Sequence, residues 1–259
     1  MSTDTGLKAR RARLILAAII VAVAGLLVAG GFAAATLTRE DAKSTPQADA
    51  GPSASSPTPS GATATDSPMT PERAQKISLR KPTDHKDGVA IGFPGSPSGG
   101  ISAAVYWWEE FAWLDDEKAA QQLKAVVSKD APGYVDKQVS EIRKMREVLG
   151  LAPSGGIPAD VNFTTAVHAA RGKTLKAPGL PAGDVMQVWL SYDRFATGPK
   201  GGTDPNPMRG DTISFVVKWE DGAWRFTDKY DALGDFPVAY EPNSPYAWSD
   251  GWVQVRHAN

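Results

Sequence analysis

Apolar side chains in the middle of the chain recur every three or four positions, a spacing typical of amphipathic helices. The pattern predicts three helices, over residues 99–114, 115–128 and 134–150. The second begins with Asp115, and a carboxylate suits a helix N-terminus. In the first helix the predicted buried stripe consists of Ile101, Ala104, Val105, Trp108, Phe111 and Ala112.

Beyond Pro158 the spacing of apolar residues changes to two, which indicates β-strands. Alternation predicts strands over 161–169 and 184–195, and a hairpin over 212–230 that turns at Asp221 and Gly222. We expect a last short strand near Trp252. The hairpin register pairs Trp219 with Trp224, Val217 with Phe226 and Lys218 with Arg225. Three helices followed by such strands predict an α+β domain, with the helices packed on a curved antiparallel sheet.

The N-terminal part of the chain shows neither the helical spacing nor the alternation of apolar residues. Residues 1–13 carry four basic side chains and one acidic one, and an unbroken apolar run follows from Leu14 to Ala35. Its 22 residues rise about 33 Å as a helix, which covers a hydrocarbon core of about 30 Å. We therefore predict a transmembrane helix over 14–37, a cytoplasmic basic tail and an extracytoplasmic remainder.

A cleaved signal peptide is the alternative, since FAAATL at residues 32–37 offers small residues to a peptidase. Its apolar region exceeds the roughly 7 to 15 residues of a signal sequence, which favours an uncleaved anchor. Residues 38–73 are rich in Pro, Ser, Ala and Thr, and this composition predicts a disordered linker. Residues 74–259 then form the exported domain.

Composition limits the function further. The chain has no cysteine, which excludes disulfides and a lipoprotein anchor. Its formal net charge is −1, and removal of the basic tail leaves a mildly acidic exported part. Such a balance lacks the positive surface that nucleic-acid binding requires, so we expect no direct nucleic-acid partner.

Chemical motifs are scarce. The stretch IGFPGSPSGG at residues 91–100 is glycine-rich but lacks the lysine of a phosphate-binding loop, so we interpret it as a turn that starts the first helix. His85, His168 and His257 have no second metal ligand nearby in the sequence. No serine lies in a G-x-S-x-G motif. The sequence therefore predicts no catalytic, cofactor-binding or metal-binding residues.

Tryptophans surround the first helix on more than one face, so we expect part of that surface to be exposed. Trp107 or Trp113 is the expected exposed aromatic. The sequence thus predicts a protein interface formed by Trp107, Glu110 and Trp113. An edge strand near Val253 and Val255 is the competing surface.

Several features together resemble a conjugation family: the tail, span and linker, the segment GVAIGFPGSPSGGISAAVYWWEEFAWL, and the hairpin VVKWEDGAWRF. They are similar to the TcpC-like proteins of Gram-positive conjugative elements and, more distantly, to the eighth-component assembly factors of type IV secretion systems. The resemblance covers residues 88–230 and the anchor topology. It implies a nuclear transport factor 2-like cone that acts as an oligomerising scaffold and has no catalytic residues.

The resemblance predicts a single-pass membrane protein of a conjugative DNA-transfer apparatus, with the bilayer, channel proteins and further copies of itself as partners. Only one such domain fits here, unlike the tandem pair of TcpC-like proteins. The same fold also hosts dehydratases and isomerases, for which Tyr106, His168, Asp193 or Asp211 would have to converge in the cone. A passive ligand-binding or cell-wall-associated domain is the third alternative. A cone filled by Trp and Phe favours the scaffold, and an open polar cone favours the enzyme.

Overall fold

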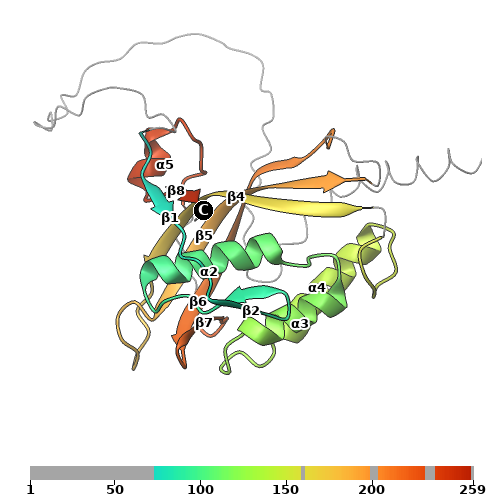
Figure 1. Ribbon diagram of the computed structural model, residues 1–259, viewed down its shortest axis with the longest axis horizontal. Helices are drawn as coiled ribbons and strands as arrows, with labels where there is room; N and C mark the ends of the chain where they lie inside the picture. The colour runs from blue at the N-terminus through green and yellow to red at the C-terminus, as the bar shows by residue number, and fades with distance from the viewer. Residues whose placement is uncertain (1–72, 159–160, 199–203, 231–236, 258–259) are drawn as a thin grey trace, which may run out of the picture.

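The computed structural model describes residues 73–158, 161–198, 204–230 and 237–257 (Figure 1). The predicted cytoplasmic tail, the transmembrane helix and almost all of the predicted linker lie outside these ranges. Within them, no helix combines the length and the apolar character that crossing a bilayer requires.

Three longer helices lie where the apolar spacing predicts them. They are α2 (Pro97–Glu110), α3 (Asp116–Val126) and α4 (Tyr134–Val148). The Ser96 hydroxyl caps α2 by accepting the Gly99 N–H at 3.3 Å. Asp115 caps α3 by accepting the Lys118 N–H at 2.9 Å. These caps satisfy donors that a helix N-terminus leaves free, so both starts are encoded locally.

The main sheet has six strands in the order β1-β8-β4-β5-β6-β7. Because β1 runs parallel to β8, the sheet is mixed, and the prediction of an antiparallel sheet is wrong at this edge. A three-residue strand is too short for its alternation to be recognised in the sequence. The strands are β1 (Lys76–Ser78), β4 (Asn162–Thr174), β5 (Val185–Thr197), β6 (Met208–Glu220), β7 (Ala223–Phe226) and β8 (Val253–Arg256), and β2 (Asp84–Lys86) pairs separately with β3 (Val89–Ile91).

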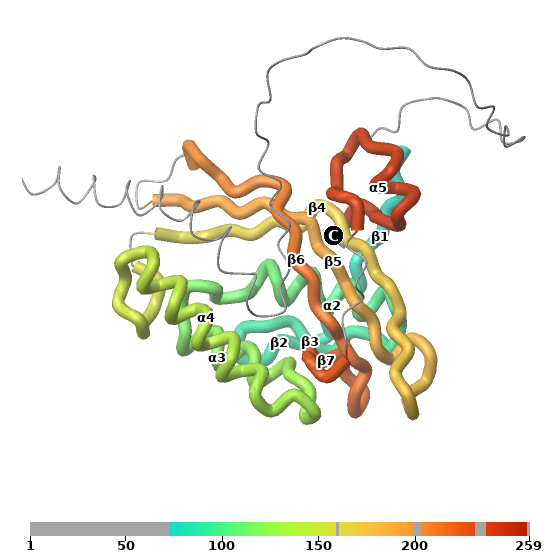
Figure 2. Tube along the Cα trace, turned by 180° about the vertical axis from the view of Figure 1, so that it is seen from behind, coloured from blue at the N-terminus to red at the C-terminus, as the bar shows by residue number. Residues whose placement is uncertain are grey.

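The helices cover one face of the sheet. Figure 1 shows α2 crossing that face with α3 and α4 beside it, and Figure 2, seen from behind, shows the long strands bending midway along their length. A short helix that the sequence pattern did not predict, α5 (Pro245–Ser249), lies next to β1. The domain is therefore an α+β arrangement of three helices packed against a mixed six-stranded sheet.

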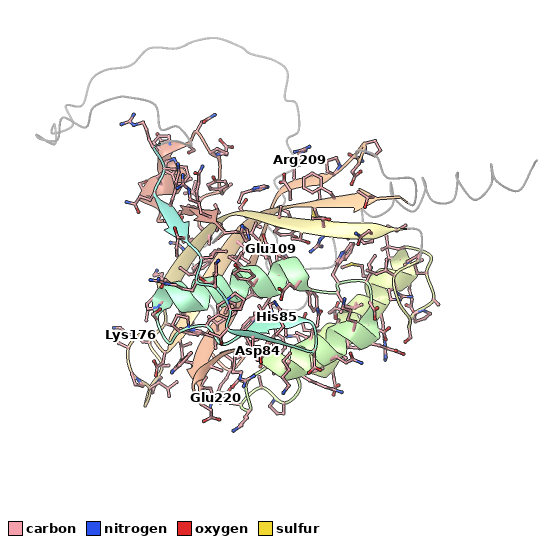
Figure 3. The ribbon with its side chains drawn as sticks, viewed as in Figure 1. Asp84, His85, Glu109, Lys176, Arg209 and Glu220 are labelled. Carbon is pink, nitrogen blue, oxygen red and sulfur yellow. The ribbon has the colours of Figure 1, made fainter. Side chains whose placement is uncertain are left out.

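The β6–β7 hairpin has the predicted register. Trp219 pairs with Trp224, Lys218 with Arg225 and Val217 with Phe226. The turn residues Asp221 and Gly222 have positive φ values of 50° and 75°, as this two-residue turn requires. The apolar face of the hairpin is buried, except that Trp219 stays partly exposed. Glu220 marks the tip of the hairpin in Figure 3.

The glycine-rich stretch lets the start of α2 approach this hairpin. Trp224 donates its indole N–H to the Pro94 carbonyl at 2.8 Å, and a Cβ on Gly95 would lie 2.7 Å from the Trp219 ring. A Cβ on Gly99 would lie 2.0 Å from the Pro94 oxygen. The glycines therefore serve close packing at a helix start, as the sequence predicts.

Replacing Gly99 by alanine should destabilise the protein by about 1 to 3 kcal/mol, because the new methyl group has no room against a backbone carbonyl. Alanine favours a helix over glycine, so propensity alone predicts the opposite sign. Gly198→Ala is the control, since a Cβ there meets nothing within 4 Å. Chemical denaturation of the full chain measures both. A Gly99→Ala protein as stable as the native one would contradict the packing.

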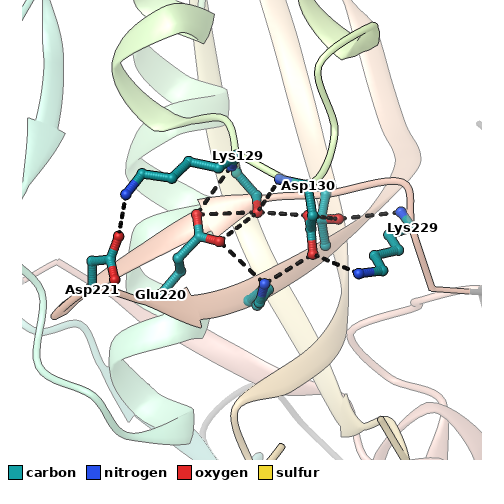
Figure 4. Close-up of polar contacts among 8 residues, drawn as sticks. Lys129, Asp130, Glu220, Asp221 and Lys229 are labelled. Carbon is teal, nitrogen blue, oxygen red and sulfur yellow. Dashed lines mark hydrogen bonds and ion pairs between the residues drawn. The ribbon is translucent and has the colours of Figure 1, made fainter. Parts of the chain in front are cut away.

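A polar network joins the connection between α3 and α4 to the β6–β7 hairpin (Figure 4). The ammonium of Lys218 donates to Asp130 at 2.8 Å and to Glu220 at 3.1 Å. Thr227 donates to the same Asp130 carboxylate at 3.0 Å. Burial alone would raise the pKa of Asp130, but the hydrogen bonds from Lys218, Ser128 and Thr227 outweigh it and lower the pKa to about 2.

A second buried carboxylate fixes the loop after α4. Asp116 accepts hydrogen bonds from Arg143 at 2.7 Å, from the Ser154 hydroxyl at 2.9 Å and from the Gly155 N–H at 2.8 Å. Burial opposes ionisation here too, yet the Gly155, Arg143 and Ser154 bonds lower the pKa of Asp116 to about 2. Both carboxylates are therefore held ionised by the folded state.

Acid should destabilise the domain through Asp116 and Asp130. Their pKa values in the folded state lie below the ordinary value of 3.8, so their contribution is complete above that pH and is lost as the pH falls towards 2. The free energy of unfolding should decline between about pH 4 and pH 2, as measured by denaturant titrations at several pH values. Asp130→Asn should destabilise the protein at neutral pH and flatten this decline. An unchanged pH profile in that variant would contradict the assignment.

Candidate functional site

The predicted interface on α2 is not exposed. Trp107 and Trp113 keep only 3% and 4% of their surface accessible, so the expectation that one of them faces solvent is wrong. Trp107 donates its indole N–H to the Ala90 carbonyl at 2.7 Å, and its ring packs on Phe226. Trp107 is buried by the β2–β3 pair, whose short strands leave no clear sequence pattern. Trp113 instead packs edge-on against Phe163 of β4, with ring centroids 5.0 Å apart.

Glu110 also serves the fold. Its carboxylate accepts the Ala90 N–H at 2.7 Å and lies 3.4 Å from Nε2 of His85 on β2. The three predicted residues therefore do not form a common exposed surface. The competing edge near Val253 and Val255 is wrong as well, because β8 lies between β1 and β4.

The space between the helices and the sheet is filled by rings. Among the described residues, a cavity of about 30 Å³ lies between these rings, which is room for about one water molecule. A small-molecule pocket usually has a volume of several hundred Å³. The rings that close this space are those of Trp107, Trp108, Phe111, Tyr134, Phe215 and Phe226.

A buried arginine lies at one end of this aromatic layer. The guanidinium of Arg194 packs 4.9 Å from the Trp108 ring and 4.5 Å from the Trp113 ring, and its Nε donates to Thr165 at 3.0 Å. Burial lowers its pKa. Its Nη2 and both indole N–H groups have no hydrogen-bond partner. Packing with the rings therefore fixes this cation more than hydrogen bonds do.

Of the four residues that an enzyme would need to bring together, only two meet. His168 Nε2 lies 3.1 Å from Asp193 Oδ2. Tyr106 instead packs against Phe93 and His257, and Asp211 accepts the Tyr192 hydroxyl at 2.8 Å. The pair that forms lies on the face of the sheet opposite the helices.

Two β-bulges create this pair. On β4, His168 is the extra residue between Val167 and Ala169, which face Tyr192 and Ser191 on β5. On β6, Arg209 and Gly210 together face the single residue Asp193, and Gly210 has the positive φ of 63° that such a bulge favours. A bulge bends its strand and re-aims a side chain. Here the bulges on both neighbours of β5 occur opposite the same carboxylate.

The Asp193 carboxylate is almost fully engaged. Oδ1 accepts the Gly210 N–H at 2.8 Å, and Oδ2 lies 3.1 Å from His168 and 3.5 Å from Arg209. The Asp193 residue is only 8% exposed, whereas the Arg209 side chain is 66% exposed. Asp193 therefore positions two side chains that solvent can reach.

His168, Asp193 and Gly210 line an open pocket of about 530 Å³, and Arg209 precedes the lining residue Gly210 in the chain. Burial raises the pKa of the Tyr240 phenol, so this group keeps its proton at neutral pH and can donate a hydrogen bond. Besides His168, Asp193 and Gly210, the lining comprises the polar residues Ser191, Tyr240 and Gln254 and the apolar residues Val167, Pro242 and Val255.

Sequence reasoning missed most of this site. Arg209 and Gly210 precede a clear alternation, and a glycine at such a place is a usable signal for a bulge. Ser191 and Gln254 lie in strands, and their polar character predicts only that their side chains point away from the core. Tyr240 follows the last long strand in a loop without periodicity. No sequence signal brings these residues together.

Comparisons with known proteins give no further identification, because no protein-family model, curated protein or solved structure matches this chain. In the part of the chain that the structure describes, no group of three or more His, Asp or Glu side chains could hold a metal ion.

Proposed function

We propose that the protein is a membrane-anchored scaffold of the cell envelope and a component of a conjugative, type IV secretion-like apparatus. In this proposal residues 14–37 anchor the chain and residues 38–73 act as a tether. The α+β domain, taken as a nuclear transport factor 2-like cone, binds other channel proteins or further copies of itself.

The filled cone is the observation that carries this proposal. The interior where enzymes of this fold hold a substrate keeps about 30 Å³, and the residues that could act as bases do not point into it together. A domain whose interior is closed by stacked rings offers rigidity and an outer surface, which suits an adaptor. Three helices on a bent sheet also support the resemblance to the cone fold.

The exposed apolar side chains indicate where a partner would bind. Tyr246 on α5 is 71% exposed and Val238 is 48% exposed. Asp250 links them, because its side chain accepts the Val238 N–H and its own N–H donates to the Tyr246 carbonyl. We call Val238 and Tyr246 the α5 surface. Figures 1 and 2 show α5 beside β1, the first strand of the described chain.

Tethering makes weak contacts at this surface sufficient. A disordered linker of this length spans on the order of 30 Å root-mean-square, so several anchored copies or a neighbouring channel protein come within reach. Anchoring also raises the local concentration of each partner, and even a weak contact is then populated.

Cross-linking in membranes of cells that carry the parent genetic element tests the proposal. The native chain should be captured with itself or with channel proteins, and Val238→Ser combined with Tyr246→Ser should reduce capture at least fivefold. Val148→Ser is the matched control, since Val148 is 50% exposed but lies on α4. Capture should be unchanged in that variant.

The outcome that would contradict the scaffold is specific. It is a native chain that cross-links to nothing, together with DNA transfer that proceeds normally when the protein is deleted. Equal capture by the native chain and the double variant would retain a scaffold but exclude the α5 surface.

A further inference from the structure

The pocket on the sheet face opposite the helices has no role in the scaffold described above. It is open, lies outside the closed cone, and is built by two independent bulges that converge on Asp193. Bulges are frequent next to functional sites because they place side chains that a regular strand cannot. Its volume of about 530 Å³ falls within the range of about 300 to 1,000 Å³ for ligand pockets.

The charges of this pocket cancel. Asp193 supplies one negative charge, and Arg209 opposes it with a guanidinium nitrogen 3.5 Å away. These two opposite charges offset each other. Because the carboxylate already has three partners, a free cation finds no unpaired negative charge, and a free anion at Arg209 would lie close to that carboxylate. The pocket therefore suits an uncharged ligand.

The lining of the pocket offers both hydrogen-bond donors and hydrogen-bond acceptors. When Nε2 of His168 carries the proton that faces Asp193, the neutral ring keeps Nδ1 as an acceptor. The Ser191 hydroxyl, the Tyr240 phenol and the Gln254 amide can each donate and accept. A ligand with many hydroxyl groups meets this mixture better than one that only accepts.

The lining also has an apolar part. Pro242 offers aliphatic surface, and Val167 and Val255 also border the pocket although their side chains pack in the core on the helix side. Tyr240 is itself held between Trp248 and Trp252, whose rings lie 5.6 Å away, so its ring is fixed in place. A sugar ring presents hydroxyl groups at its rim and C–H groups on its faces, and both kinds of surface find a counterpart here.

From these observations we propose that the pocket lined by His168, Asp193, Ser191, Tyr240 and Gln254 binds a neutral saccharide of one or two rings. His168 is the positioned contact residue of the lining, and Arg209, which Asp193 also holds, stands next to the lining residue Gly210. This inference does not depend on the scaffold proposal, because it concerns a different group of side chains from the α5 surface.

Binding is tested with the full chain in a detergent that has no sugar headgroup. Cellobiose and N,N′-diacetylchitobiose are the neutral probes, and inorganic phosphate is the anionic probe. Saturation-transfer NMR detects contact with each sugar, and calorimetry measures the dissociation constant. At least one disaccharide should bind, and phosphate should neither bind nor compete.

Variants connect this binding to the pocket. His168→Gln and Arg209→Gln should each weaken disaccharide binding at least tenfold. Lys176→Gln is the matched control, because it removes one exposed cation that lies far from Arg209 (Figure 3), and it should bind as the native chain does. The exposed Arg209 side chain keeps the test valid if His168→Gln fails to fold, and thermal unfolding checks both variants.

Three results would overturn the proposal: no binding of either disaccharide to a folded chain, equal binding by all variants, or binding of phosphate in place of sugar. Each can be told apart from a failure of the scaffold. Loss of sugar binding in Arg209→Gln should leave cross-linking through the α5 surface unchanged.

Discussion

The rest of the structure depends on the close approach of α2 to the β6–β7 hairpin. Trp224 donates to the Pro94 carbonyl, and the glycines that follow leave no side chain between the helix start and the sheet. These contacts hold α2 close to the sheet. At this short distance the ring of Trp107 packs on Phe226 and the ring of Trp108 packs on Phe215. A helix held further out would leave a cavity under it. The ring-filled layer between α2 and the sheet is thus a consequence of small residues at one helix start. These glycines belong to the stretch that resembles a phosphate-binding loop in its glycine content.

The parts of the fold that the sequence predicts correctly are those whose information is local. Helical spacing locates α2, α3 and α4, and the Asp221–Gly222 turn determines the hairpin register because two strands joined by a two-residue turn have only one pairing. The errors come from segments of three residues. In strands as short as β1, β2 and β3, alternation is indistinguishable from chance, yet β1 makes the sheet mixed and covers β8, while β2 and β3 bury Trp107. Burial of that side chain therefore depends on partners that lie elsewhere in the chain.

The pocket around Asp193, on the sheet face opposite the helices, shows a second limit of sequence reasoning. Alternation along β4 correctly places His168 on the more polar face, and both His168 and Asp193 are residue types that invite attention. Their meeting depends on one inserted residue in β4 and one in β6. A shift of one residue moves every following side chain to the other face, so a bulge missed in the sequence changes which residues can converge. The bulges also bend the long strands, which means that the curvature of the sheet and the position of the site have the same origin.

The two faces of β5 separate one acidic and one basic side chain. Asp193 and Arg194 are neighbours, and alternation sends the carboxylate to the open face and the guanidinium into the aromatic layer. Among the described residues no carboxylate forms an ion pair with Arg194, and packing on the Trp108 and Trp113 rings supports a cation that burial disfavours. Asp193 does not face Arg194 and contacts His168 and Arg209 instead. The polar side chains of this part of the sheet therefore lie on the face that solvent reaches, while aromatic rings fill the face that the helices cover. Ala247 of α5 packs with Ala169 and Trp189 on this same open face, so the α5 surface and the pocket both lie outside the ring-filled helix side of the sheet.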